Sequence, residues 1–162
     1  MLASIVGRNS ALNVFFGGEG RQPRPGHIYI AQPELHLVVR GTGALGLDDG
    51  PKVRHSRPAA DRLFETAAAA YTKNVIGLVL SGGEGDGVEG FVAIKAHRGI
   101  SIVQSPMDAR EPSMPPTRCY ATALITWFLI EQIGPLLMRL VNQRAGKDIH
   151  AHDVSRSAPK HS

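Results

Sequence analysis

The sequence has 162 residues, a length that suits one domain, and 43% of them are hydrophobic, which is enough for a buried core. Only 6% are aromatic, so we expect that core to consist mainly of aliphatic side chains. The net charge is +4, and the four basic and two acidic residues of segment 142–162 supply +2 of it. The rest of the chain is therefore only mildly basic, which argues against a nucleic-acid-binding surface.

Cys119 is the only cysteine, which excludes an internal disulfide and fits a reducing compartment. The first residues lack the basic start, long apolar stretch and cleavage site of a signal peptide. The longest apolar run, 119–130, is too short to span a bilayer. We therefore expect a cytoplasmic protein with no direct membrane insertion.

In the first third of the chain, we expect residues 2–12 to contain the end of a helix and Asn13 to Phe16 to form a short strand. The segments 27–31 and 35–40 are rich in β-branched and aromatic residues, and the three residues between them predict a hairpin. Residues 41–51 continue irregularly, with an edge strand as one interpretation.

The pattern becomes helical from Pro58 to Tyr71, where apolar residues recur on one face. The run 74–81 is apolar without alternation, as expected for a parallel strand covered on both faces. A glycine-rich loop follows, then a helix from Val88 to near Gly99 and a second buried strand at 100–104. This alternation of strands and helices predicts an α/β fold with right-handed crossovers.

The last part begins with a proline-rich loop at 105–116. Helices are predicted from about Thr117 to Ile125 and from Ile130 to about Gln143, with Pro135 in or near the first turn of the second. Segment 142–162 is polar, and we expect it to be disordered.

The glycine-rich loop, VLSGGEGDGVEG at 79–90, raises the main question about function, because Gly85, Gly87 and Gly90 match the dinucleotide motif G-x-G-x-x-G. In that motif the first glycine directly ends its strand, whereas Gly85 comes several residues later. Glu84 and Asp86 would also place carboxylates beside a pyrophosphate. An acid about 20 residues further on, Asp108, lies in a predicted loop rather than at a strand end. The pattern disfavours a nucleotide site.

Asp86 has two other interpretations, and the residues alone leave both open. It can cap the helix that starts near Gly87, with Glu89 completing a capping box. It can also be a site residue, because α/β proteins place their sites just beyond the carboxyl ends of central strands. One side chain can fill both roles.

Four blocks of sequence resemble the catalytic domain of the chemotaxis protein-glutamate methylesterases, the CheB family. They are PGHIYIAQPELHLVV (25–39), RHSRPAADRLFETAAAAY (54–71), VIGLVLSGGEGDGVEGFVAIKAHRGISIVQSP (75–106) and PSMP (112–115). The family pattern around the loop is L-T-G-M-x-x-D-G-x-x-G. The resemblance implies a doubly wound, mostly parallel α/β sheet with an antiparallel hairpin.

The family hydrolyses glutamyl methyl esters on chemoreceptors with a Ser–His–Asp triad, so the resemblance implies a methylated chemoreceptor as partner and no cofactor. It aligns Asp86 with the triad aspartate. It aligns Gly83 with the methionine whose backbone N–H helps to form the oxyanion hole; a glycine keeps that N–H but loses the side-chain packing.

The family's serine turn, G-A-S-x-G-G, and its Q-H segment do not occur in these 162 residues. Ser4 and Ser10 fall in the helix that follows the family's catalytic histidine, and His36 matches a hairpin histidine instead. We therefore expect residues 1–141 to form a partial methylesterase domain that lacks the first strands and is inactive as it stands. The alternative is a non-catalytic remnant that binds the receptor.

Three further groups of residues have side chains that could carry chemistry. Cys119 with His97 would make a nucleophile pair, but no local motif supports it, and a single cysteine is usually a packing residue. His150 and His152 in the polar tail could hold a transition metal, although a solvated tail is the better interpretation. Arg54, His55 and Arg57 form a small basic cluster, which is either a solvated loop or a contact for an acidic receptor surface.

Overall fold

The computed structural model describes the whole chain except residues 1, 9, 81–84, 106–125 and 155–162. Its strands are β1 (Asn13–Phe16), β2 (His27–Ile30), β3 (His36–Val39), β4 (Leu45–Asp48), β5 (Ile76–Val79), β6 (Ile100–Gln104) and β7 (Thr126–Phe128). Its helices are α1 (Leu2–Arg8), α2 (Ala60–Tyr71), the short 3-10 helix η1 (Thr72–Asn74), α3 (Val88–Ala96) and α5 (Ile130–Val154).

The strands form three small sheets. β5, β6 and β7 pair in parallel in that order, β1 pairs in parallel with β2, and β3 pairs with β4 in an antiparallel hairpin. The mostly parallel α/β architecture and the presence of an antiparallel hairpin agree with the fold class expected from the sequence. The predicted hairpin partners were wrong, because β2 turns away from β3 to lie beside β1.

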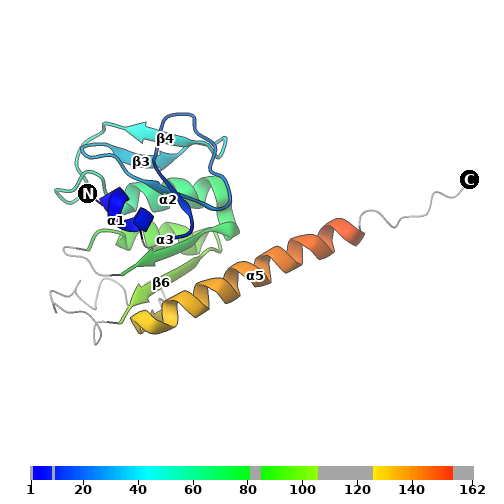
Figure 1. Ribbon diagram of the computed structural model, residues 1–162. Helices are drawn as coiled ribbons and strands as arrows, with labels where there is room; N and C mark the ends of the chain where they lie inside the picture. Colours follow the sequence, from blue (N-terminus) through cyan, green and yellow to red (C-terminus); the bar gives the residue numbers. More distant parts are fainter. Residues whose placement is uncertain (1, 9, 81–84, 106–125, 155–162) are drawn as a thin grey trace, which may run out of the picture.

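The layers are visible in Figure 1, where the β3–β4 hairpin lies above α2, and α3 lies between α2 and the sheet of β5 and β6. Helix α5 leaves the body of the molecule as a long single helix. It extends to Val154, past the end predicted near Gln143. Pro135 lies in its second turn, which agrees with the predicted place in or near the first turn. The boundary between a domain of 1–141 and a disordered tail of 142–162 stays a prediction.

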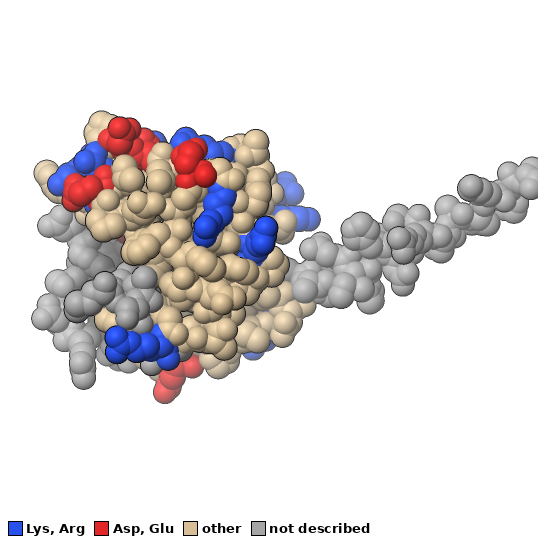
Figure 2. All heavy atoms as spheres, turned by 45° about the horizontal axis from the view of Figure 1, so that its top comes forward, with Lys and Arg blue, Asp and Glu red and all other residues tan. Residues whose placement is uncertain are grey.

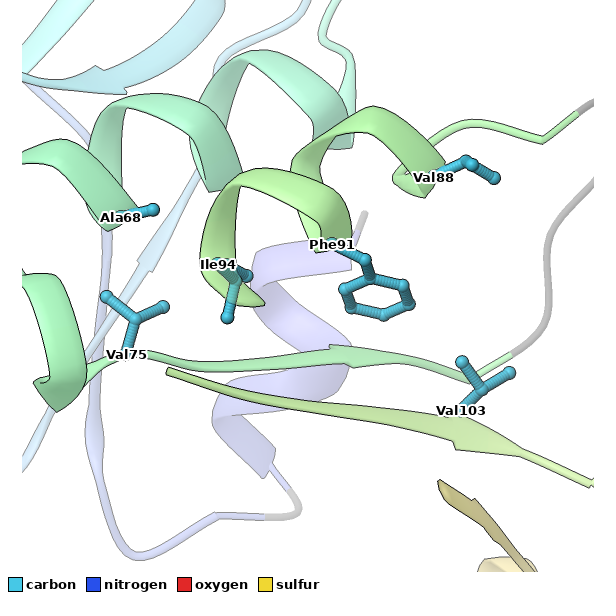
Figure 3. Close-up of a cluster of buried hydrophobic side chains, with 6 residues drawn as sticks. All are labelled: Ala68, Val75, Val88, Phe91, Ile94 and Val103. Carbon is cyan, nitrogen blue, oxygen red and sulfur yellow. The ribbon is translucent and has the colours of Figure 1, made fainter. Parts of the chain in front are cut away.

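The main core lies between α3 and the sheet (Figure 3). Phe91 and Ile94 are fully buried and point from α3 toward the strands, and Phe91 stacks on Phe64 of α2 with ring centroids 5.4 Å apart. The other buried members of this cluster are Ala68, Val75, Val88 and Val103. Aliphatic residues thus dominate the core, as the composition predicts.

Charged side chains of both signs are mixed on the face shown in Figure 2, where they gather mainly over one end of the molecule. A few basic side chains lie nearer the middle of that face, and a second small group of charged side chains lies at its bottom. Among the described residues, no helix combines the length and the apolar character that a bilayer span needs.

Candidate active site around Asp86

Asp86 lies between the carboxyl end of β5 and the start of α3, in a turn flanked by two glycines with positive φ. Gly85 has φ +77° and Gly87 has φ +93°. A Cβ on Gly87 would lie 3.2 Å from Cγ2 of Val79, so this position is also crowded. These glycines are explained by backbone conformation and packing beyond the carboxyl end of β5.

The third glycine of the motif, Gly90, is required by the contact between α2 and α3. A Cβ there would lie 2.5 Å from Cβ of Phe64, closer than real Cβ contacts allow. The spacing that resembles a dinucleotide fingerprint therefore includes a glycine that permits close helix packing.

The carboxylate of Asp86 caps α2 rather than the helix that follows it. Oδ2 accepts a hydrogen bond from the Ala60 N–H at 2.8 Å, and Oδ1 accepts one from the Asp61 N–H at 3.1 Å. The predicted capping box on α3 is wrong, because the residue before that helix is Gly87, which has no side chain to form it. The first turn of α2 instead satisfies two of its free amides with a side chain 25 and 26 residues away.

Asp61, in the first turn of α2, in turn caps α3. Its Oδ1 accepts from the Gly90 N–H at 2.8 Å, in the first turn of α3. Each helix start is thus held by a carboxylate from the neighbourhood of the other, and we call Asp61, Asp86 and their three amide donors the cross-capped pair. Asp61 was not among the residues predicted from the sequence. A signal for it existed, since Asp61 shares the buried helix face with Phe64 and Ala68 at spacings of three and seven.

Asp61 is 2% exposed, and burial raises the pKa of its carboxyl above the ordinary value. The Gly90 N–H and the Arg54 guanidinium act in the opposite direction, while the negative charges of Asp86 and Glu89 raise the pKa further. Asp61 therefore carries a charge that its surroundings disfavour, next to the residue that the sequence singled out.

His36 completes the amide contacts of the α2 start. It is fully buried, its Nδ1 accepts from the Ala59 N–H at 3.1 Å, and its Nε2 lies 3.1 Å from the carbonyl oxygen of Pro51. An Nδ1 that accepts leaves the proton on Nε2, which donates to Pro51. This histidine is a packed structural residue, consistent with its assignment to the hairpin rather than to catalysis.

Arg54 stands beside the same turn. Its Nε is 3.6 Å from Oδ2 of Asp61, and its Nη2 is 3.7 Å from Oε1 of Glu89. Arg57, the other arginine of the predicted basic cluster, donates to the carbonyl oxygens of Asp49 and Gly50 instead. The structure thus divides this cluster between two different sets of partners.

Several other predicted residues lie outside the described part of the chain or have no described side chain. Gly83 and Cys119 fall in undescribed segments, so the oxyanion-hole and nucleophile-pair assignments stay predictions. His97 is exposed at the end of α3, with Nδ1 2.9 Å from the Ala93 carbonyl oxygen. Ser10 accepts from the Leu12 N–H at 3.0 Å.

The metal prediction also remains untested. The backbone of His150 and His152 is helical in α5, but their side chains belong to the part that the structure does not describe. Within the described residues, no group of three or more His, Cys, Asp or Glu side chains is arranged to hold a metal ion.

The described surface includes a smaller and a larger hollow. A small apolar one of about 200 Å³ borders the α2 start and is lined by Ala31, Leu37, Pro58, Ala59, Ala60 and Leu63. A larger one of about 500 Å³ lies over β1, β2 and the loop between them and includes no member of the cross-capped pair. Asp86 is not among the lining residues of either hollow, although Ala60, whose amide it binds, lines the smaller one.

Comparison with known proteins assigns the chain to a family. Residues 1–137 match the family model of the CheB methylesterases. A protein of Leptospira interrogans is 34% identical over 122 residues, covering 75% of this chain and 63% of its own length. Protein-glutamate methylesterase/protein-glutamine glutaminase 2 of Caulobacter vibrioides is 34% identical over 140 residues, covering 84% of this chain and 40% of its own length.

The crystal structure of the Thermotoga maritima CheB methylesterase catalytic domain superimposes with a TM-score of 0.78 at 26% identity, covering 86% of this chain and 75% of that one. The chain spans 63% of the length of the Leptospira interrogans relative and 40% of the length of the Caulobacter vibrioides relative. A match of this extent to the family model, together with these relatives, shows that the chain belongs to the CheB methylesterase family.

Proposed function

We propose that this chain supplies the aspartate of a Ser–His–Asp site that hydrolyses glutamyl methyl esters on chemoreceptors. Its relatives carry the name protein-glutamate methylesterase. The resemblance of the glycine loop to the family motif implies that Asp86 is the triad aspartate. The observation that carries the proposal is the geometry of Asp86 at the carboxyl end of β5, where two backbone amides fix its carboxylate. We propose the cytoplasm as its location, on the same family grounds.

The role of Asp86 in such a site follows from its hydrogen bonds. Each carboxylate oxygen has two acceptor positions, and each uses one on an amide of α2. The positive end of that helix favours a negative charge at its first turn. The remaining acceptor positions can receive an imidazole N–H, hold the ring in the tautomer that removes the serine proton, and stabilise the imidazolium that results.

The serine turn and the Q-H segment are not found in these 162 residues, so the triad serine and histidine must be supplied by another segment. We propose that the backbone N–H of Gly83 donates a hydrogen bond to the oxyanion. The relatives' second name, protein-glutamine glutaminase, describes amide hydrolysis, which uses the same acyl-transfer groups. We therefore include glutamine side chains as candidate substrates. A chain that binds receptor without catalysis is the competing proposal.

The test compares methanol release from methylated receptor by two proteins. One is the 162-residue chain alone, and the other is the same chain joined to a family segment that carries the serine turn and the Q-H segment. We expect background release from the first and serine-inhibitor-sensitive release from the second. Receptor binding by the joined protein without any release would favour the non-catalytic proposal.

In the joined protein, Asp86→Asn should lower kcat by about 10⁴, the loss that the equivalent change causes in the chymotrypsin triad. The reason is that asparagine keeps the shape but favours the wrong imidazole tautomer. Asp49→Asn makes the same chemical change at an exposed position and serves as the matched control. Near-normal hydrolysis by Asp86→Asn would leave Asp86 as a helix cap alone.

A further inference from the structure

Arg54 is held in a backbone conformation that non-glycine residues rarely adopt. It occupies a tight turn in which the Val53 and Ser56 backbones exchange hydrogen bonds of 3.1 and 2.8 Å. Arg54 and His55, the two central residues, have φ of +47° and +66°. Left-handed backbone at ordinary residues persists where the surrounding structure fixes it, and it gathers at functional sites.

The turn places the Arg54 guanidinium next to the residue that precedes Asp86. Its Nη1 is 3.7 Å from the position of a Cβ on Gly85. Within the described residues, its ion pairs at or below 4.0 Å are with Asp61 and Glu89, and none joins it to Asp86. A cation therefore stands beside the residue that precedes the candidate triad aspartate, while two other carboxylates hold it.

Such a cation competes with catalysis if it moves. An arginine forms strong, often bidentate hydrogen bonds with a carboxylate. Paired with Asp86, Arg54 would occupy the acceptor positions that an imidazole needs and would neutralise the charge that stabilises imidazolium. A site that uses Asp86 therefore needs a means of holding this guanidinium elsewhere.

Asp61 has the geometry for that task. Its Oδ1 is used by the Gly90 N–H, whereas its buried Oδ2 has no hydrogen-bond partner among the described residues and faces Arg54 at 3.6 Å. Helix capping alone needs only Oδ1, and an asparagine would supply that acceptor without a buried charge. The second oxygen and the charge are explained by Arg54.

We propose that Asp61, assisted by Glu89, is a positioning residue that holds the Arg54 guanidinium away from Asp86, so that the Asp86 carboxylate stays open to an imidazole. The catalytic part of this proposal rests on the proposed function of Asp86. The separation of Arg54 from Asp86 can be tested in the 162-residue chain without any activity.

The first test is a double-mutant cycle on the melting temperature of the 162-residue chain. Arg54→Gln and Asp86→Asn are combined in the native background and again with Asp61→Asn, which keeps the Gly90 acceptor and removes only the charge. We expect additive shifts in the native background, because the two groups do not pair there. With Asp61→Asn we expect a coupling of about 2 °C or more, because the freed guanidinium pairs with Asp86.

Either of two results overturns the proposal. Coupling in the native background would mean that Arg54 already pairs with Asp86, and additivity with Asp61→Asn would mean that Asp61 does not keep them apart. If Asp61→Asn fails to fold, Glu89→Gln takes its place, because the Glu89 side chain is 62% exposed and its change leaves the cap bonds intact. A smaller coupling of the same sign is then expected, and additivity again overturns the proposal.

The second test uses the joined protein of the methanol assay. Asp61→Asn should lower kcat at least tenfold with KM little changed, and adding Arg54→Gln should restore most of the loss. A loss without this rescue would assign Asp61 a purely structural role and overturn the proposal. If Asp86→Asn costs nothing in the same assay, the proposed function fails, and the melting cycle still decides whether Asp61 separates the two groups.

Discussion

Helices α3 and α5 each follow a strand of the same three-stranded sheet, but they bury different shares of their apolar residues. In α3, Val88, Phe91 and Ile94 are buried. In α5, Met138 and Val141 are 64% and 55% exposed, although Ile133 and Leu136 nearer its start are buried. Figure 1 shows the reason, since α3 is enclosed between α2 and the sheet while α5 runs away from the body.

The candidate site lies at the start of α3, the better buried of these two helices. Asp86 and Asp61 belong to the starts of α3 and α2, whose relative position is fixed by close packing at Gly90 and by the cross-capped pair. A catalytic carboxylate must be held within a fraction of an ångström of its productive position. The packing of α2 on α3 supplies that rigidity. Helix α5 contributes to the core mainly through its first turns, where Ile133 and Leu136 are buried.

The largest expected effect tests this contrast directly. Phe91→Ala removes a fully buried ring and should cost about 3–5 kcal/mol of unfolding free energy, because a cavity is left between α3 and the sheet. Met138→Ala, at an exposed position of α5, should change it by less than about 0.5 kcal/mol. Denaturant unfolding followed by circular dichroism measures both. Equal losses of unfolding free energy at the two positions would contradict the difference in packing between α3 and α5.

A matched pair of glycines sharpens the comparison. Gly90→Ala should destabilise the protein by about 1–3 kcal/mol, because the new Cβ meets Cβ of Phe64 at 2.5 Å. The same change at Gly134 of α5 meets nothing within 4 Å apart from its chain neighbours. Because the ring of Pro135 disfavours a helical alanine just before it, this clash offsets the gain in helix propensity, and we expect a change of less than about 1 kcal/mol. The same unfolding experiment reads both, and a stabilising Gly90→Ala would contradict the close contact of α2 and α3.

Elements defined by local sequence were predictable. The strands at 76–79 and 100–104 and the helix at 88–96 follow from continuous apolar runs, a change of pattern and glycine punctuation. The hairpin was assigned to the wrong strands because pairing depends on distant neighbours. β2 pairs with β1 across a ten-residue loop, while β4 has the sequence LGLD, whose glycine and aspartate weaken the strand signal.

The candidate site was predictable in one residue but not in its contacts. Asp86 stood out through the glycine loop and the family motif, yet its amide partners lie 25 and 26 residues away, beyond any capping rule that uses local spacing. Asp61 was equally hard to predict, because the Gly90 amide that it accepts from lies 29 residues later in the chain. Contacts between helix starts depend on how α2 packs on α3, which periodicity does not specify.

The smallest expected effect concerns the pH dependence that Asp61 introduces. Its pKa in the folded chain is raised, chiefly by burial and also by Asp86 and Glu89, and only partly offset by Gly90 and Arg54. Between the ordinary aspartate pKa and the raised value, the folded state therefore binds more protons than the unfolded state, so stability falls as pH rises through that window. Asp61→Asn has no such proton to lose.

The melting temperature of Asp61→Asn minus that of the native chain should therefore grow as pH rises through the window and then stay constant. Thermal unfolding of both proteins from about pH 3.5 to 7.5 measures this difference, starting below the ordinary aspartate pKa of about 3.9. A native chain that gains stability relative to Asp61→Asn with rising pH would mean that the Arg54 pair outweighs burial. Asp61 would then belong with the stabilising ion pairs, and its buried charge would need no functional explanation.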